Sequence, residues 1–182
     1  MKSEFDAARL DLKKLAQSGA QLHGDDTLAD YSRLMAEVSD DAKDGALRWS
    51  ARGELRQAHG TSPEVWLHLQ VQTCMPLVCQ RCMGKVQQEV SLTLPFRFVK
   101  DEETAQMLDE EAEEDVLALT PSFDLHALIE DEVLMALPLV PRHEVCPTEV
   151  RLAVADPDFD NPEVVKPNPF AVLAHLADKK PG

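Results

Sequence analysis

Three stretches in the middle of the chain alternate apolar and polar residues, and this two-residue period is the strongest constraint on the fold. The stretches begin at Leu47, Val65 and Val90, and the third ends at Phe98. A two-residue period places successive side chains on opposite faces of a strand, so each stretch predicts a strand with one buried face. Because short turns separate the stretches, we predict an antiparallel meander over residues 47–100.

A C-x-x-C motif, Cys79 to Cys82, falls in the turn between the second and third predicted strands. Two thiolates at this spacing can bind the same tetrahedral metal ion, but two ligands do not close a site. The remaining ligands must come from elsewhere, and His143 and Cys146 have the right chemistry. We therefore predict a structural zinc site, with no position open for water, made of Cys79, Cys82, His143 and Cys146.

Two other interpretations of the motif stay open. A redox pair needs its first cysteine at a helix N-terminus, whereas this motif leads into a strand. Two free thiols packed near a turn would need no metal. Cys74 fits the end of the second strand as a small apolar residue. The chain has no nucleophile motif, no metalloprotease motif and no glycine-rich phosphate loop, so we expect neither an enzyme nor a small-molecule substrate.

Apolar residues recur at helical spacing in three further segments. We predict helices at 27–38, at 124–137 with Asp124 as N-cap, and at 169–178. Their apolar stripes need a partner, so we expect them to cover the apolar face of the sheet. The sequence thus predicts one α+β domain with four parts: a helical or loosely ordered segment 1–46, the sheet 47–100, an acidic loop 101–120 and a helical part 121–182.

The net charge of −15 is distributed unevenly along the chain. Residues 47–100 carry seven basic and three acidic side chains, whereas nine of the fifteen residues 101–115 are acidic. We interpret 101–115 as a mobile solvated loop, with nucleic-acid mimicry or a docking tail as alternatives. The chain begins with charged residues and has no apolar run of about 18 residues, so we expect a cytoplasmic protein without a membrane segment.

Basic side chains recur in the predicted sheet. Arg48, Arg52 and Arg56 share one face of the first strand, and other cations lie on the neighbouring strands. They can line a basic surface, whereas the alternative is a solvated face neutralised by Glu54 and Glu89. The residues concerned are Arg48, Arg52, Arg56, Arg81, Lys85 and Arg97.

Three segments, in matching order, closely resemble the YceD family: LVCQRC at 77–82, LIEDEVLMALPLVPRH at 128–143 and KPNPFAVLA at 166–174. These are small bacterial proteins, with plastid relatives, implicated in accumulation of the large-subunit (23S) ribosomal RNA. In this resemblance Cys79, Cys82 and Cys146 fall where the family has cysteines, and His143 falls where it has a histidine. Cys74 has no counterpart.

The resemblance implies a noncatalytic ribosome-biogenesis factor that serves the synthesis, processing or stability of 23S ribosomal RNA. Large-subunit RNA or pre-ribosomal proteins would be its partners, and the six basic residues of the sheet would be the candidate RNA contacts. An acidic chaperone for a basic ribosomal protein, using residues 101–115, is an alternative that fits the negative charge better. A metal or thiol redox protein acting through Cys79 and Cys82 is a third.

Overall fold

The computed structural model describes residues 5–38, 44–57 and 63–149, together with Val154 and Phe170. The chain divides into two compact units, Met1–Thr148 and Glu149–Gly182. Every helix and strand among the described residues lies in the first unit. The helix predicted at 169–178 lies outside the described residues. Of the helices in the described ranges, none is long and apolar enough to cross a membrane.

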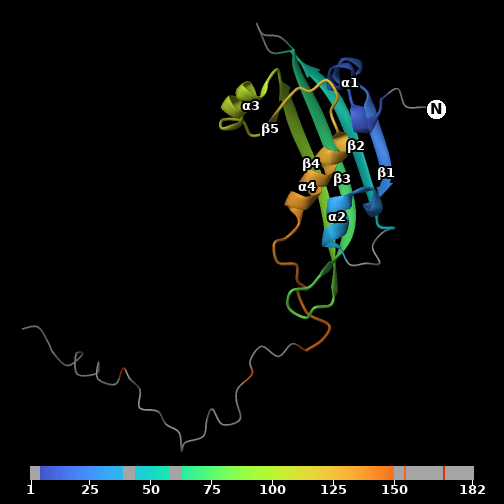
Figure 1. Ribbon diagram of the computed structural model, residues 1–182, viewed down its shortest axis with the longest axis vertical. Helices are drawn as coiled ribbons and strands as arrows, with labels where there is room; N and C mark the ends of the chain where they lie inside the picture. The colour runs from blue at the N-terminus through green and yellow to red at the C-terminus, as the bar shows by residue number, and fades with distance from the viewer. Residues whose placement is uncertain (1–4, 39–43, 58–62, 150–153, 155–169, 171–182) are drawn as a thin grey trace, which may run out of the picture. The chain divides into compact units, whose positions relative to one another are not determined.

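A five-stranded sheet in the order β1-β2-β3-β4-β5 forms the body of the first unit (Figure 1). Its strands are β1 (Gln21–Thr27), β2 (Ala46–Arg56), β3 (Glu64–Val78), β4 (Lys85–Val99) and β5 (Asp115–Ala118). The first four strands pair antiparallel, and β5 runs parallel to β4. The predicted meander is confirmed as β2–β4, and the predicted α+β class is confirmed, whereas the parallel β5 was not predicted.

The two-residue period of the sequence becomes one apolar face of the sheet. Ala51 on β2 pairs with Leu69 on β3, and Leu69 pairs with Leu94 on β4. This register places the apolar positions of the three strands on the same side, where Ala51 and Leu69 are fully buried. The other side of β2–β4 carries the polar residues of the alternation.

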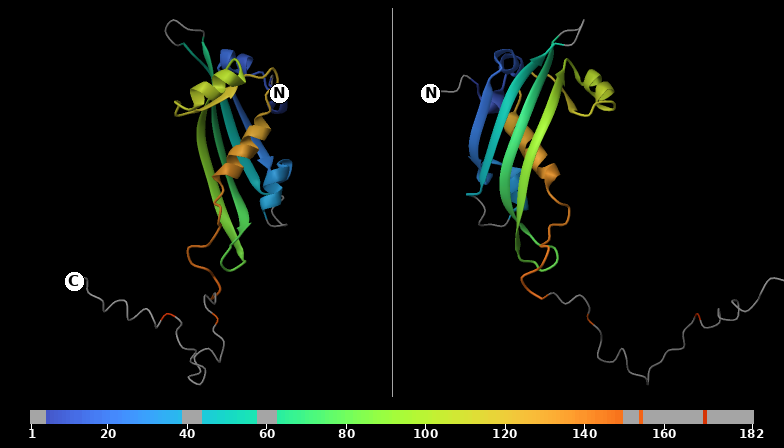
Figure 2. Two further views of the ribbon diagram at one scale, coloured as in Figure 1. Left: turned by 60° about the vertical axis from the view of Figure 1, so that its left-hand side comes forward. Right: turned by 180° about the vertical axis from the view of Figure 1, so that it is seen from behind.

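Helices cover the apolar face. They are α1 (Leu12–Ser18), α2 (Ser32–Glu37) and α4 (Leu125–Ala136), with short 3-10 turns at η1 (Ala7–Arg9) and η2 (Leu28–Asp30). Their buried leucines join the inward residues of the strands in a single apolar core. Seen from behind, the strands lie in front of α4, so no helix of the described residues covers the opposite face (Figure 2). We call this opposite side of β1–β4 the open face.

Close contact between α1 and the sheet depends on Gly53. A Cβ atom at Gly53 would lie 2.6 Å from the backbone nitrogen of Ala16, so only glycine lets the helix backbone approach β2 this closely. α1 begins after Asp11, whose side chain accepts from the N–H of Lys14, and ends at Gly19, which has φ 61°. Local sequence signals therefore set both ends of α1.

The two described helices predicted from sequence agree with the structure to different degrees. α4 confirms the helix predicted at 124–137, with the Asp124 side chain accepting from the N–H of Ala127. The helix predicted at 27–38 is interrupted, because Tyr31 has extended backbone between η2 and α2. The Tyr31 side chain is buried, and its hydroxyl donates to Asp26 Oδ2 at 2.7 Å.

The prediction of an acidic loop at 101–120, which includes the solvated loop expected at 101–115, is wrong for most of this segment. Residues Glu102–Asp109 form α3, and Asp115–Ala118 form β5. The side chain of Asp101 accepts from the N–H of Thr104 and caps α3, and Ala105 packs inward at 3% exposure. The acidic residues thus lie on α3, at the start of β5 and in the connection between them, next to β4.

Candidate functional site

The C-x-x-C motif forms a tight turn at the end of β3. The N–H of Cys79 donates to the Gly84 carbonyl at 2.8 Å, and the N–H of Met83 donates to the Cys79 carbonyl at 2.9 Å. Met83 closes the turn in the left-handed region with φ 59°. The turn brings both cysteine side chains to one side and leads directly into β4, so the helix N-terminus that activates redox C-x-x-C pairs is missing at this described turn.

The segment after α4 lies beside this turn (Figures 1 and 2). Pro138 follows the helix and the chain then runs without regular structure to residue 149. The N–H of Gln80 donates to the Pro141 carbonyl at 2.8 Å, which fixes the segment against the turn. Because Pro141 is only two residues before His143, this hydrogen bond positions the imidazole beside the two cysteines.

Four ligand atoms converge where the two segments meet. The side-chain ligand atoms of Cys79, Cys82, His143 and Cys146 all lie within 4.8 Å of one another. The Sγ atoms of Cys79 and Cys146 are 4.0 Å apart, and Cys82 Sγ is 3.5 Å from His143 Nδ1. A tetrahedral zinc ion would hold two sulfurs about 3.8 Å apart, and a sulfur and a nitrogen about 3.6 Å apart. The four residues predicted from sequence therefore form a group close enough to bind one metal ion.

The imidazole of His143 is oriented for metal binding. Its Nε2 lies 2.9 Å from the carbonyl oxygen of Lys85, the first residue of β4. Since a carbonyl only accepts, this contact assigns the proton to Nε2 and leaves the lone pair of Nδ1 facing Cys82. A backbone carbonyl that holds the second ring nitrogen is the usual support of a histidine ligand.

The electrostatics of the thiols also suit a cation. Burial raises the pKa of the Cys79 thiol, but the N–H groups of Cys82, His143 and Arg81 stabilise the thiolate and lower the pKa to about 5. Burial and the neighbouring Cys82 and Cys79 sulfurs raise the pKa of Cys146 to about 11. Several thiolates in one small group repel one another, and a bound cation removes that repulsion.

Cys74 is separate from this group. It is exposed on the open face of β3, where its Sγ lies 3.4 Å from Gln87 Oε1. It is not one of the four clustered ligands.

The six basic residues named from sequence differ in their surroundings. Arg48 and Arg52 have side chains that are 72% and 55% exposed, and their nearest carboxylates, on Asp25 and Glu54, are 3.7 Å away. Exposed ion pairs at such distances contribute little, so both guanidinium groups remain available to an anion.

Arg56 and Arg97 are engaged within the protein. The Arg56 guanidinium lies 3.9 Å from the ring centroid of Trp66 and 3.2 Å from Glu54. Arg97 is only 17% exposed, and its Nε lies 2.9 Å from Glu114 Oε1. Contacts with anions at Arg97 would require breaking this ion pair first.

Arg81 and Lys85 lie at the other end of the sheet. Arg81 is exposed within the C-x-x-C turn, and Lys85 begins β4 beside His143. The structure therefore does not gather the six residues into one continuous basic surface.

Uncharged polar residues between these arginines were not predicted as part of a site. Gln72 and Gln70 on β3 pair with Ser91 and Thr93 on β4, and all four are exposed on the open face. In the sequence these residues are the polar positions of the two-residue period, and such positions by themselves indicate only which side of each strand faces solvent.

Comparisons with known proteins cover the same part of the chain. The family model described as "Large ribosomal RNA subunit accumulation protein YceD" matches residues 67–177. A protein of Haemophilus influenzae named "Large ribosomal RNA subunit accumulation protein YceD" is 35% identical over 114 residues, which cover 60% of this chain and 63% of that relative. The chain thus aligns with less than two thirds of the relative's length. No solved structure matches the chain significantly.

The matched residues 67–177 include most of β3, all of β4 and α4, and the four clustered ligands. The family match spans more than half of the chain. This protein therefore belongs to the YceD family.

Proposed function

We propose that this protein acts in the cytoplasm as a noncatalytic ribosome-biogenesis factor, required for accumulation of large-subunit (23S) ribosomal RNA. The observation that carries the proposal is membership of a family whose matched relative is named for this role. Synthesis, processing and stability of the RNA are all compatible with that name. The partners are large-subunit RNA or proteins of the pre-ribosome.

A structural zinc ion belongs to the proposal. Three thiolates and one imidazole are a ligand set that zinc prefers, and four protein ligands complete a tetrahedral shell. Hydrolytic zinc sites keep one position for water, so a closed set supports a structural and noncatalytic site. Bound there, zinc would supply a cross-link between the β3–β4 turn and the segment after α4.

Depletion of the protein in cells tests the biological role. We expect the amount of large-subunit RNA to fall relative to small-subunit RNA, and wild-type protein supplied from a plasmid to restore it. An unchanged ratio of the two RNAs after full depletion would refute the proposed function.

The metal is tested on the purified full chain. We expect about one zinc ion per chain by elemental analysis, and loss of that ion in Cys82→Ser but not in Cys74→Ser. Stoichiometric zinc also separates the proposal from the redox alternative, in which Cys79 and Cys82 would cycle between thiols and a disulfide. Purified protein that takes up no zinc under reducing conditions, yet forms a Cys79–Cys82 disulfide reversibly, would favour the redox protein.

One observation favours a second candidate, an acidic chaperone or adaptor for a basic ribosomal protein. α3 presents an ordered acidic surface with Glu102 and Glu103 exposed, and Met107 stands among these carboxylates at 72% exposure. A basic partner with an apolar contact would suit this surface. Crosslinking in cells distinguishes the two candidates. The chaperone hypothesis predicts that a ribosomal protein is recovered with this protein, and that this crosslink is lost when Glu102 and Glu103 are replaced by glutamine.

A further inference from the structure

The open face of the sheet is polar but carries few charges at its centre. Rows of paired residues run across it: Arg48 on β2 pairs with Gln72 on β3, which pairs with Ser91 on β4. In the next row Ser50 pairs with Gln70, which pairs with Thr93. The side chains in these rows offer hydrogen-bond donors and acceptors without a net negative charge, although the chain as a whole carries −15.

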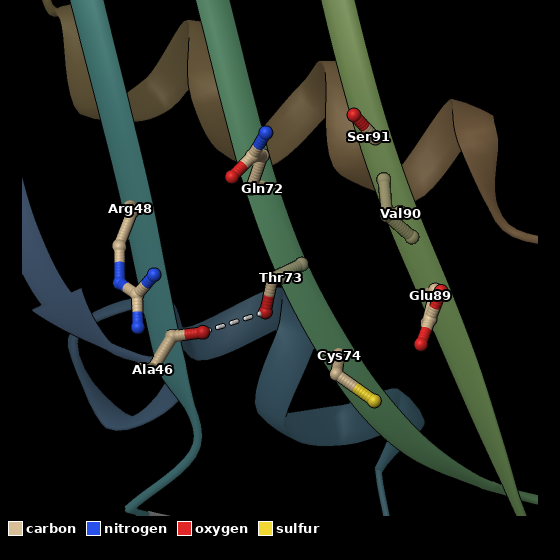
Figure 3. A pocket seen from close by; sticks show the side chains of 8 residues that line it. All are labelled: Ala46, Arg48, Gln72, Thr73, Cys74, Glu89, Val90 and Ser91. Atoms are coloured by element: carbon tan, nitrogen blue, oxygen red, sulfur yellow. Dashed lines mark hydrogen bonds between the residues drawn. The ribbon is translucent and has the colours of Figure 1, made fainter.

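Two shallow hollows lie on this face and share Arg48 and Gln72 in their linings. One has a volume of about 450 Å³ and reaches Cys74, Glu89 and Ser91. The other, of about 210 Å³, reaches His23 and Gln70. Figure 3 shows the first hollow with α4 behind the strands, so it opens on the side that the helices leave uncovered. Small side chains such as Ala46 and Ser91 create this space between longer ones.

Cations border the rows. Arg48 and Arg52 lie on β2 four residues apart, which places their Cα atoms about 13 Å from each other. Both are more than half exposed. Farther along the same face, beyond Arg52, the Arg56 guanidinium lies over Trp66, and its own side chain is 42% exposed, so it adds a flat surface near the end of β2. A guanidinium plane of this kind is a surface on which an unpaired base can stack.

We propose that the open face binds single-stranded RNA, with Arg48 and Arg52 on phosphates and the two rows on the edges of unpaired bases. Amides and hydroxyls match the donors and acceptors of base edges, which are accessible in single strands and not in the deep groove of an RNA duplex. Hollows of a few hundred cubic ångströms can receive a base turned away from its strand. This inference rests on the proposed function and gives its direct ligand.

The acidic α3 limits where RNA can lie. It lies next to β5 beyond the β4 edge of the sheet, and its carboxylates repel phosphate. On the open face two carboxylates also oppose phosphate: Glu89 lines the first hollow, and Glu54 lies 3.7 Å from Arg52 and 3.2 Å from Arg56. Replacing Glu54 by a neutral residue should therefore make Arg52 and Arg56 more available to phosphate.

Fluorescence anisotropy of the full purified chain with a labelled single-stranded 12-nucleotide RNA tests the inference. Arg48→Glu with Arg52→Glu should weaken binding at least about tenfold at low salt, and should reduce the slope of log affinity against log salt by about 1.4 for two lost phosphate contacts. Glu54→Gln should tighten binding about twofold to fivefold. The gain in Glu54→Gln keeps the test informative if the double variant folds poorly.

The matched control is Lys13→Glu with Lys14→Glu, which makes the same charge change on exposed positions of α1, the helix packed on the covered face. We expect its affinity to stay within about twofold of wild type. Equal weakening in the control and in the arginine variant would overturn the assignment to the open face. A 12-base-pair RNA duplex that binds as tightly as the single strand would overturn the preference for unpaired bases.

The RNA-binding assay and the depletion experiment can fail independently of each other. If depletion lowers large-subunit RNA but the purified chain binds no single-stranded RNA, the proposed function stands and this inference falls in favour of a protein partner. If the chain binds the RNA through Arg48 and Arg52 but depletion leaves ribosomal RNA unchanged, the binding surface stands and the biological role falls.

Discussion

Replacement of Glu130 by glutamine tests how α4 holds α2. The carboxylate of Glu130 is 8% exposed; its Oε1 accepts from the N–H of Arg33 at 2.6 Å and of Leu34 at 3.3 Å, and its Oε2 accepts from Arg33 Nε at 2.8 Å. Both N–H groups belong to the first turn of α2, where a helix has no internal acceptors. No capping side chain precedes α2, so Glu130 supplies its N-cap from another helix.

The size of the effect follows from these contacts. Glutamine keeps one oxygen for the two backbone N–H groups, so the main loss is the charge-assisted bond to Arg33, a class that contributes about 1.5–3 kcal/mol. Arg33 is 49% exposed and also pairs with Asp131, which lowers the loss. We expect Glu130→Gln to reduce the free energy of unfolding by about 1–2 kcal/mol. Glu130→Ala leaves both N–H groups without an acceptor and should cost about 3 kcal/mol.

Urea unfolding of the full purified chain, followed by circular dichroism, measures this difference, and its pH dependence checks the cause. Burial raises the pKa of Glu130, but the hydrogen bonds from Arg33 and Leu34 leave it below the ordinary value of 4.5. A carboxyl with a lowered pKa stabilises the fold fully above its unfolded pKa, and this contribution disappears as the pH falls through its folded pKa. The gap between wild type and Glu130→Gln should therefore be constant near neutral pH and close below pH 4.5.

Asp131→Asn is the matched control, because Asp131 contacts the same arginine from the same helix but is 52% exposed. It should change the free energy of unfolding by less than about 0.5 kcal/mol. Wild-type stability of Glu130→Gln at pH 7, or an equal loss in Asp131→Asn, would refute this role of the Glu130 carboxylate.

Two further changes should also lower stability. Removal of the metal by a chelator, or Cys82→Ser, should reduce the free energy of unfolding by several kcal/mol, with Cys74→Ser unchanged; equal urea midpoints with and without metal would exclude a structural site. Gly53→Ala should cost about 2 kcal/mol in the same assay, because its Cβ would meet the α1 backbone at 2.6 Å, and an unaffected midpoint would show that α1 can shift away.

The sheet and the ligand group could be predicted from sequence because their signals are local. Strands show their buried face through the two-residue period, and β2–β4 follow it closely. The ligand group could be predicted because few residue types bind soft metals and the chain has few cysteines. What sequence could not supply is the hydrogen bond between Gln80 and Pro141 that brings the two halves together.

The acidic segment shows why composition was a poor guide there. Nine acidic residues among fifteen predict a solvated loop, but position along a helix matters as much as number. Asp101 is the N-cap of α3, and Glu102 and Glu103 occupy its first turn, where the helix dipole favours negative charge. β5 pairs with β4, and this pairing leaves Val116 buried at 5% exposure. Both effects depend on a few residues within a strongly charged background.

The arginines show a different limit. Their shared strand face follows from the sequence period, but their availability depends on partners that only the register brings near. Trp66 pairs with Arg97 across β3 and β4 and has Arg56 stacked on its ring, whereas Glu114 reaches Arg97 from beyond α3. Only the structure therefore separates the available Arg48 and Arg52 from the engaged Arg56 and Arg97.

α4 connects α2 with the ligand group on the covered side of the sheet. Glu130 joins α4 to α2, and the segment that follows α4 is joined to the β3–β4 turn by Pro141 and by the ligand group. Both connections lie away from the open face, so they close the apolar side of the sheet without using its polar side. On the polar side Arg97 pairs with Glu114, which follows α3, but the hydrogen-bonding rows lie farther along the strands and remain available to a partner. A stabilising role for the metal group and a binding role for the open face are therefore compatible within the same sheet.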